Sequence, residues 1–395
     1  MSRWWIAVGA LVVAGGCTDS PTVTEPAPAF KQSLPAAGAN GITVMTRNVY
    51  VGADVDQVIS APTNQLPLYV TQAYLELLST DFPTRARALV DEIAAARPHL
   101  VGLQEITLIR MQVPGDFLVM GSGGPTIGNP MPNATDVLFD YEAILLAELA
   151  ARGLDYQVAA RIQETDVELP GALSETSFFD IRQTDFDLIL VRGDVAWSNP
   201  DGANYTATLD VPFLPGYTLS ILRGWVSVDA TVAGKAFRFV NTHFESFSPL
   251  VRVPQAQELL LSPDGPVAGS PLPVVLVGDL NADAATVDPS DAYALLTGAG
   301  FVDVWSASKL KGAGLTCCFS SNLQDPVADF HSRIDLILAR GLWGPGNSGI
   351  AGGSWAEVVG EEPGDRELFE DGGYYLWPSD HAGVVATLKL PRNGK

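Results

Sequence analysis

The sequence places polar residues that suit phosphate and metal chemistry at or near the ends of short apolar runs. Strand ends beside loops are where open-sheet proteins hold ligands. Hydrolysis of a phosphate ester needs a hard cation held by carboxylates, a base for water, and donors for the charge that develops on phosphorus. The residues of these types are Asn48 in TRNVYVG, Glu105 in GLQE, His243 in NTHF, Asp279 and Asn281 in GDLN, Asp335 in SRIDLIL, and Asp380 and His381 in SDH.

Each of these motifs alone also has an ordinary structural explanation. Asp279 and Asn281 are residue types that shape tight turns. Glu105 in isolation is equally well an exposed carboxylate at a strand end, and a lone histidine such as His243 is more often structural than catalytic. The argument for chemistry therefore rests on the joint occurrence of the motifs, which include two of the four histidines in the chain.

The elements that would position these side chains are short strands and helices that alternate from residue 41 onward. Helical spacing of apolar residues, a capping Asp81 and a terminating Pro98 predict one of the helices. The short apolar run at residues 100–103 predicts a buried strand, and Glu105 follows at its end. Hairpins mixed with helices predict an α/β (α+β) layered sandwich, not a purely parallel sheet. The expected strands are 42–48, 100–103, 186–191, 225–232, 237–242, 273–278, 334–338 and 383–390, and the expected helices are 66–79, 82–97 and 141–152.

In their order, five of these motifs resemble the endonuclease/exonuclease/phosphatase superfamily over residues 42 to 390. Members of that superfamily include DNase I-like nucleases, apurinic endonucleases, inositol phosphatases and bacterial neutral sphingomyelinases. The motifs GDLN and SDH are weak signals alone, whereas five ordered motifs form a strong joint signal. The resemblance implies a DNase I-like four-layer sandwich, in which two mixed β-sheets pack face to face with helices outside.

Side-chain chemistry, sharpened by the resemblance, assigns the metal and the base. Glu105 is expected to hold a Mg²⁺ or Mn²⁺ ion, with Asn48 positioning the metal or the phosphate and Asp380 close to the metal. Because Mg²⁺ usually keeps several waters, one or two protein ligands suffice. Asp279 is expected to be the general base for the attacking water, and Asn281 to orient that water or the phosphate.

The histidines receive their roles in the same way. His381 is expected to contact a phosphoryl oxygen, while Asp335 accepts a hydrogen bond from its other ring nitrogen and so fixes its tautomer and charge. Through the family pattern, His243 becomes a second donor to the phosphate. His99 and His331 are expected to be structural, with His331 a marginal candidate for the rim of the site.

The sequence also departs from the family pattern. Apurinic endonucleases carry a second acidic ligand two residues after the position of Asn48, and this chain does not, which argues against the DNA-repair subgroup. Residues 311–330 form a long loop that either lines the substrate mouth or lies on the surface. That loop contains the adjacent Cys317 and Cys318, which either form a vicinal disulfide or pack as free thiols.

Composition narrows the classes of protein further. The chain has 395 residues, 47% of them apolar, which is enough for a large core and excludes a wholly disordered chain. Its 23 Lys and Arg residues against 45 Asp and Glu residues give a formal charge of −22. This acidic balance argues against broad, charge-driven binding of nucleic acid, although bound metal ions would change the local charge.

The N-terminus predicts export. Residues 1–16 are typical of a signal peptide, and their one apolar run, residues 4–16, is shorter than the ~20 residues that span a bilayer. The sequence AGGC resembles a bacterial lipobox, which implies a lipidated Cys17 and a membrane anchor. Thr18 in place of Asp favours the outer membrane or cell surface, with release as an alternative. Residues 17–40 are expected to be a flexible tether and residues 41–392 the folded domain.

Together these observations predict a secreted or anchored, Mg²⁺- or Mn²⁺-dependent phosphoesterase. A phosphodiester, either nucleic acid or a phospholipid head group, is the favoured substrate. Aromatic residues expected in loops would contact lipid, stack on bases or pack in the core; they are Phe178, Phe179, Trp343, Trp355, Tyr374, Tyr375 and Trp377. The alternative is a non-catalytic surface lipoprotein that keeps the fold and binds a ligand. No protein partner is inferred.

Overall fold

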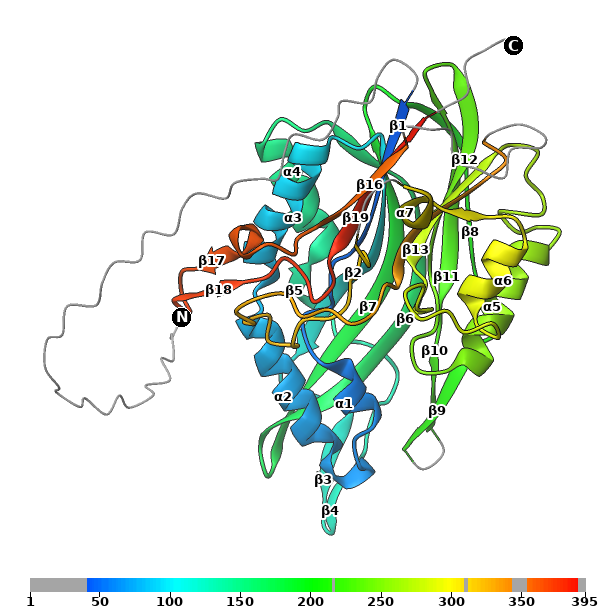
Figure 1. Ribbon diagram of the computed structural model, residues 1–395. Helices are drawn as coiled ribbons and strands as arrows, with labels where there is room; N and C mark the ends of the chain where they lie inside the picture. Colours follow the sequence, from blue (N-terminus) through cyan, green and yellow to red (C-terminus); the bar gives the residue numbers. More distant parts are fainter. Residues whose placement is uncertain (1–40, 215–216, 309–311, 343–353, 390–395) are drawn as a thin grey trace, which may run out of the picture.

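The computed structural model describes residues 41–214, 217–308, 312–342 and 354–389, and these residues form two large β-sheets packed face to face (Figure 1). The expected signal peptide, Cys17 and the tether lie outside the described residues, as does Trp343. No helix in the described part of the chain is long and apolar enough to cross a membrane.

The first sheet has seven strands and the second has six among the described residues, and both mix parallel with antiparallel pairs. In spatial order the first sheet contains β16 (Trp355–Val359), β19 (Gly383–Lys389), β1 (Gly41–Asn48), β2 (Leu100–Gln112), β7 (Ser177–Arg192) and β6 (Tyr156–Ser174), with β5 (Asp136–Asp140) also paired to β2. The second contains β14 (Val302–Asp303), β15 (Asp335–Arg340), β13 (Val274–Asp279), β12 (Lys235–His243), β11 (Gly224–Val232) and β8 (Ala196–Asn204).

Helices and small hairpins surround the two sheets. The helices are α1 (Val55–Ile59), α2 (Leu66–Ser79), α3 (Phe82–Ala96), α4 (Tyr141–Ala151), α5 (Pro249–Leu261), α6 (Ala292–Gly298) and α7 (Val304–Ala307), with short 3₁₀ turns at Thr63–Gln65 and Pro363–Asp365. The two-stranded hairpins are β3 (Leu118–Gly121) with β4 (Gly124–Ile127), β9 (Leu209–Leu214) with β10 (Tyr217–Ile221), and β17 (Glu367–Phe369) with β18 (Tyr374–Leu376).

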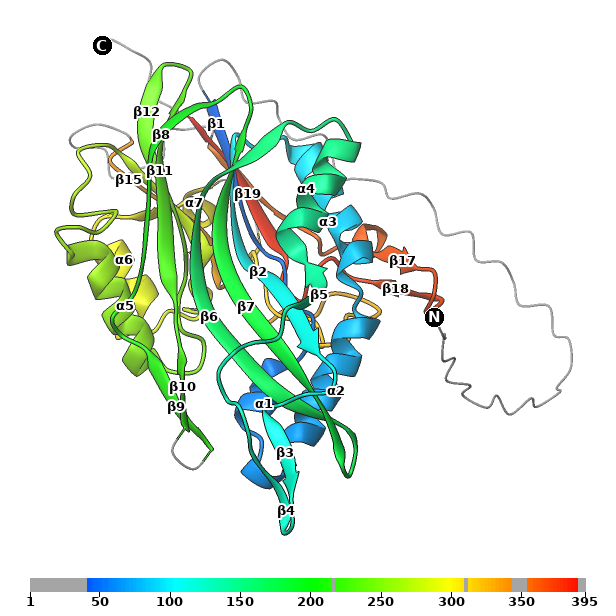
Figure 2. The ribbon, with the colours of Figure 1, turned by 180° about the vertical axis from the view of Figure 1, so that it is seen from behind.

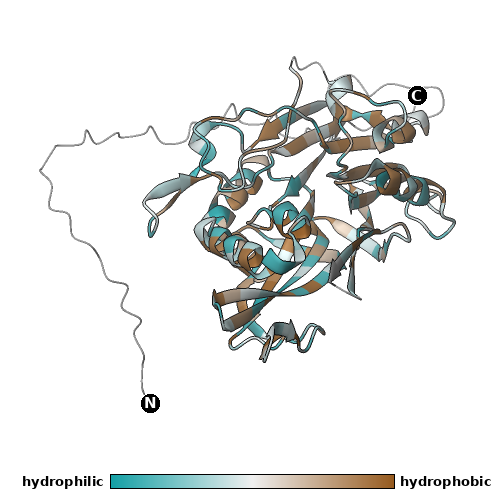
Figure 3. Cartoon of the chain, turned by 90° about the horizontal axis from the view of Figure 1, so that it is seen from below, coloured by the Kyte–Doolittle hydropathy of each residue, from teal (hydrophilic) through white to brown (hydrophobic). Residues whose placement is uncertain are grey.

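Three apolar layers hold the sandwich together. Between the sheets, alternate residues such as Val44, Val226 and Val277 form one buried cluster. The outer face of the first sheet packs on α3 and α4, and the outer face of the second packs on α5 and α6. Figure 2 shows these two helix pairs on opposite sides of the molecule, and Figure 3 shows hydrophobic segments, in brown, interspersed with hydrophilic ones along the strands. The expected four-layer α+β sandwich is confirmed.

Local sequence signals placed the helices well, because capping is a local interaction. Asp81 and Asp140 accept hydrogen bonds from the backbone N–H groups three residues later, at the starts of α3 and α4. The strands are longer than expected: the strand predicted at 100–103 extends to Gln112, and the one predicted at 186–191 begins at Ser177. Phe178 and Phe179 therefore lie in β7, not in a loop, and both are buried.

Candidate active site

The second sheet aligns three of the predicted site residues in one row. His243 ends β12, Asp279 ends the parallel β13, and Asp335 begins the antiparallel β15; the register pairs His243 with Asp279 and Asp279 with Asp335. Gly278 makes this close spacing possible, since its φ is 151° and a Cβ there would lie 1.8 Å from the carbonyl oxygen of Thr242. All three side chains of the row are buried.

The first sheet brings Asn48 and Glu105 to the same place. Glu105 does not end its strand, as the sequence had suggested. It lies at an irregularity in β2 between Leu103 and Ile106, with a left-handed φ of 61°. Such a bulge re-aims a side chain within a continuing strand. The Nδ2 atom of Asn48 donates to Glu105 Oε1 at 2.9 Å and to Asp279 Oδ2 at 3.1 Å, and so links the two sheets.

His381 and Asp335 form the predicted pair. Nδ1 of His381 lies 2.9 Å from Asp335 Oδ2, and its Nε2 lies 3.8 Å from Asp279 Oδ2. Burial alone would lower the pKa of His381, but the carboxylates of Asp335, Asp380 and Asp279 raise it well above its ordinary value. The raised pKa favours the imidazolium form of His381, in which both ring nitrogens are donors.

In His243 the pKa is shifted in the opposite direction, which favours the neutral ring. Burial, reinforced by the Arg223 guanidinium, lowers the pKa of His243 well below its ordinary value. Nη1 of Arg223 lies 3.0 Å from His243 Nδ1. Because an arginine can only donate, Nδ1 must accept and the proton of the neutral ring is on Nε2. That Nε2–H group lies 3.6 Å from Asp279 Oδ2.

Arg223 and the acidic side chains around it are part of the site that sequence reasoning missed. Nη1 of Arg223 lies 3.5 Å from Glu164 Oε2 and 3.7 Å from Asp185 Oδ2. Burial raises the pKa of Glu164 to about 8 and that of Asp185 to about 7. Asp187 lies close to Glu164 and His243. The available signal was the alternation of Asp185 and Asp187 in DFDLIL, where two acidic residues occupy one face of a predicted buried strand.

The donor set fits a divalent cation. Burial, with Asp335 close by, raises the pKa of Asp279 to about 7, and burial raises that of Asp380 to about 6. Glu105 adds to the negative field at Asp380. Side-chain oxygens of Asn48, Glu105 and Asp380 are hard donors of the kind that Mg²⁺ prefers. A divalent ion among them would offset the excess of buried carboxylates.

Comparison with known proteins decides the family. A model of the endonuclease/exonuclease/phosphatase family matches residues 73–381. The chain belongs to this family. Membership identifies it as a hydrolase of phosphoester bonds, within a family that generally depends on divalent metal ions. A comparison with curated protein sequences found no match.

Several solved structures of the family are similar to this chain. The mannosyl-6-phosphatase of Bacteroides thetaiotaomicron is 17% identical, with a TM-score of 0.49 over 87% of this chain and 98% of its own. A family protein from Bacteroides vulgatus is 16% identical, with a TM-score of 0.49 over 89% and 99%. Truncated TDP2 of Caenorhabditis elegans is 14% identical, with a TM-score of 0.43 over 88% and 98%.

The structure of this family member brings all eight predicted site residues of the domain together. Six of them line a single cavity, namely Glu105, His243, Asp279, Asn281, Asp380 and His381. The other two are hydrogen-bonded to residues that line it: Asn48 to Asp279, and Asp335 to His381. Asn281 has a left-handed φ of 49°, and its amide nitrogen donates to the carbonyl of Phe244. The catalytic and metal-binding roles of these residues remain predictions.

The other two histidines lie elsewhere. Nδ1 of His99 accepts a hydrogen bond from the backbone N–H of Thr43, which agrees with the expected structural role. His331 is exposed and is not among the residues that line the cavity.

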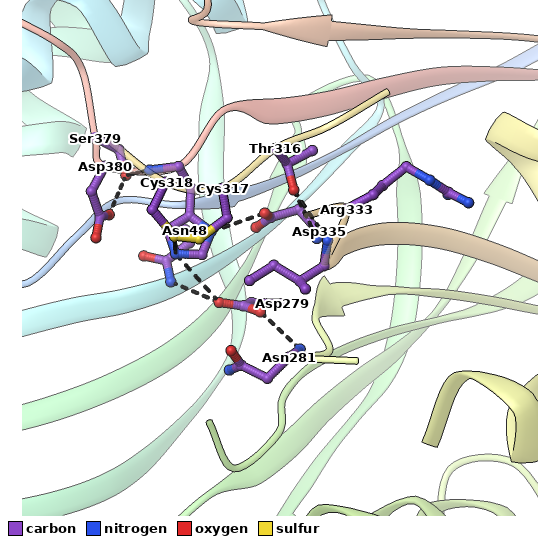
Figure 4. The surroundings of a disulfide bond; sticks show 12 residues. Asn48, Asp279, Asn281, Thr316, Cys317, Cys318, Arg333, Asp335, Ser379 and Asp380 are labelled. Atoms are coloured by element: carbon purple, nitrogen blue, oxygen red, sulfur yellow. Dashed lines mark hydrogen bonds and ion pairs between the residues drawn. A yellow bond between two sulfur atoms is a disulfide. The ribbon is translucent and has the colours of Figure 1, made fainter. Parts of the chain in front are cut away.

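Four residues of the expected loop line the cavity, namely Cys317, Cys318, Phe319 and Ser321. Its two cysteines are joined as a disulfide (Figure 4). Sγ of Cys318 lies 3.9 Å from His381 Nε2. Phe319 stacks on the buried Trp377 with ring centroids 4.1 Å apart. Of the three roles considered for the aromatic residues, Trp377 therefore packs in the core. Of the alternatives left open by the sequence, the structure has the disulfide and the mouth-lining loop.

Proposed function

We propose that the protein is a Mg²⁺-dependent phosphodiesterase whose substrate carries a large apolar group next to the scissile phosphate, as a phospholipid does. One observation supports this choice: the cavity that contains Asp279 and His381 is also lined by a group of apolar side chains, and we call this part of it the chamber. The whole cavity has a volume of about 510 Å³, which is in the range of small-molecule sites.

The chamber lies between the α1–α2 segment and the outward parts of β6, β7 and β10. Its apolar lining consists of Val55, Val58, Val70, Ala73, Leu77, Val167, Leu169, Ile181, Leu219 and Ile221. Filling such a space with an acyl chain removes apolar surface from water, worth roughly 25 cal/mol per Å². In the described part of the chain, Arg223 is the one Arg or Lys among the lining residues, which disfavours a nucleic-acid strand.

The residues of the chain supply positions and protons for the reaction. Asp279 takes a proton from water as the new P–O bond forms. The P–O bond to the leaving group breaks, and the departing alkoxide takes a proton from solvent water to become the alcohol. His381 as an imidazolium and His243 through Nε2–H donate to phosphoryl oxygens, and Asn281 orients the water. A divalent ion held by Glu105, Asn48 and Asp380 would add Lewis-acid stabilisation of the developing charge.

A panel of substrates tests the proposal. The purified protein would be incubated with phosphatidylcholine and sphingomyelin in mixed micelles, with plasmid DNA and RNA, and with inositol phosphates and a water-soluble chromogenic diester. We expect Mg²⁺-dependent release of a phosphorylated head group from a lipid, abolished by chelator and faster than cleavage of DNA or RNA. Faster cleavage of nucleic acid would refute the assignment of a lipid substrate, but the protein would still be a phosphodiesterase. Absence of turnover on every substrate with Mg²⁺ or Mn²⁺ would favour the ligand-binding alternative.

A pair of variants on one helix checks the chamber itself. Ala73→Phe places a ring in the chamber, whereas Gln72→Phe adds the same group to the exposed face of α2. We expect Ala73→Phe to lower lipid hydrolysis at least tenfold and leave cleavage of the small diester within about twofold, because a single such overpacking costs roughly 1–3 kcal/mol. Equal effects of both variants on lipid would argue against the chamber.

Export and anchoring remain proposals from the sequence. We propose that Cys17 becomes the lipidated N-terminus of the mature protein. Mass spectrometry of the protein purified from its native membrane should find an N-terminal peptide that begins at Cys17 and carries diacylglycerol. A mature N-terminus at another residue, without lipid, would contradict the anchor but not the enzymatic proposal.

A further inference from the structure

A second group of acidic side chains lies outside the active-site cavity. Asp116 is in the segment before the β3–β4 hairpin, Glu168 is on β6 and Asp180 is on β7. One ligand oxygen from each can be chosen so that the three lie within 4.8 Å of one another. Glu168 is 3% exposed and Asp180 is 0% exposed, so two of the three carboxylates are almost completely removed from water.

The hydrogen bonds of the two buried carboxylates use one oxygen each. Oδ2 of Asp180 accepts from the backbone N–H groups of residues 116–117 at 2.6 and 2.9 Å. Oε2 of Glu168 accepts from the backbone N–H groups of residues 133–134, both at 2.7 Å. These bonds hold both ends of the segment that carries the β3–β4 hairpin against the β6–β7 pair of strands.

The other oxygens have nothing to satisfy them. Oδ1 of Asp116, Oε1 of Glu168 and Oδ1 of Asp180 are buried and have no hydrogen-bond partner within the described ranges. None of the three carboxylates forms an ion pair with a described residue, and the nearby Arg182 is bonded to Asp166 instead. Buried, unpaired carboxylate oxygens are costly unless a cation meets them.

We propose that Asp116, Glu168 and Asp180 bind one Ca²⁺ ion, which ties the hairpin segment to the body of the first sheet. Three carboxylates without histidine or cysteine form a hard, oxygen-only donor set, which excludes the softer transition metals. Mg²⁺ is usually held by one or two carboxylates and keeps its waters, whereas Ca²⁺ accepts six to eight oxygens in flexible geometry. The proposal is independent of the reaction at the catalytic cavity.

Thermal unfolding of the protein after exhaustive chelation tests this site. With saturating Mg²⁺ present throughout, added Ca²⁺ should raise the melting temperature by at least about 3 °C and slow proteolytic cleavage within residues 113–134. Calorimetric titration with Ca²⁺ should give one site per chain. Absence of any shift and of binding heat would overturn the proposal.

Variants locate the ion. Asp116→Asn should lose the Ca²⁺-dependent shift; this side chain is partly exposed, so the variant is expected to fold. Glu168→Gln should lose it as well, and Asp136→Asn, an exposed neighbour on β5, should keep it. Glu105→Gln in the catalytic cavity should also keep it. If Glu105→Gln abolished the shift, or Asp116→Asn retained it, Ca²⁺ would act elsewhere and the assignment would be wrong.

Discussion

Asp279→Asn should lower the turnover of the protein by roughly 10² to 10⁴, the usual contribution of a general base. The substitution keeps the size of the side chain and its capacity to accept the hydrogen bond from the Asn281 backbone. It removes the proton acceptor that faces His243 and His381. The measurement is the rate of hydrolysis of the best substrate of the panel at saturating Mg²⁺.

The effect must be separated from misfolding. Asp264→Asn makes the same chemical change at an exposed position and should keep full activity. The melting temperature of Asp279→Asn is measured alongside, because the amide nitrogen that replaces Oδ2 faces the donors Asn48 Nδ2 and His243 Nε2–H, and some loss of stability is expected without unfolding. An Asp279→Asn protein that is folded and as fast as the parent would show that another group is the base.

Residues that belong to short local patterns were predictable from the sequence. The capping residues Asp81 and Asp140 each act within one helical turn, so the chain itself encodes the helix starts. Asp279 and His381 were identifiable because GDLN and SDH are compact motifs that follow or precede an apolar strand. Their convergence needed the resemblance, since no local rule relates positions a hundred residues apart.

The features of the site that could not be predicted depend on the register between strands that are distant in the sequence. The bulge that turns Glu105 into the site exists because β2 and β7 slip past one another between Leu103 and Ile106, and pairing of that kind is not visible in either strand alone. The same holds for Arg223 and Glu164, which are 59 positions apart and meet through packing of one sheet on the other. Polar residues on buried strand faces were the available but unused signal.

Arg223→Met should be the most destabilising single change in the site, costing about 3–5 kcal/mol of unfolding free energy. The guanidinium is 13% exposed and lies within 3.7 Å of Glu164 and Asp185, which are buried at the meeting of the two sheets. Without it, two carboxylates are buried with no countercharge. Chemical denaturation in the presence of chelator measures the loss, so that no metal ion replaces the missing cation.

The loss of unfolding free energy in Arg223→Met should depend on pH, and the direction of the pKa shifts determines whether it grows or shrinks as the pH rises. The pKa values of Glu164 and Asp185, about 8 and 7, are above those of the unfolded chain, so the folded protein binds more protons between about pH 4 and 8. The stability contributed by these protons is present at low pH and is lost as the pH rises. Removing Arg223 raises both pKa values further, so the destabilisation should be smaller at pH 5 than at pH 8.

A matched arginine shows whether burial is the cause. Arg238 is 17% exposed, close to the 13% of Arg223, but its partner Asp229 is 14% exposed, whereas Glu164 is 0% and Asp185 is 8% exposed. Arg238→Met should cost less than Arg223→Met and show little pH dependence over the same range. Burial of Asp229 is outweighed by the hydrogen bonds that it accepts from Arg238 and Asn199, which lower the pKa of this carboxyl, so it is ionised throughout that range. If the two variants lost equal stability with equal pH dependence, the buried carboxylates would not be the reason that Arg223 is needed. If the stability of Arg223→Met alone depended steeply on pH, the guanidinium of Arg223 would be established as the countercharge of the buried carboxylates between the two sheets.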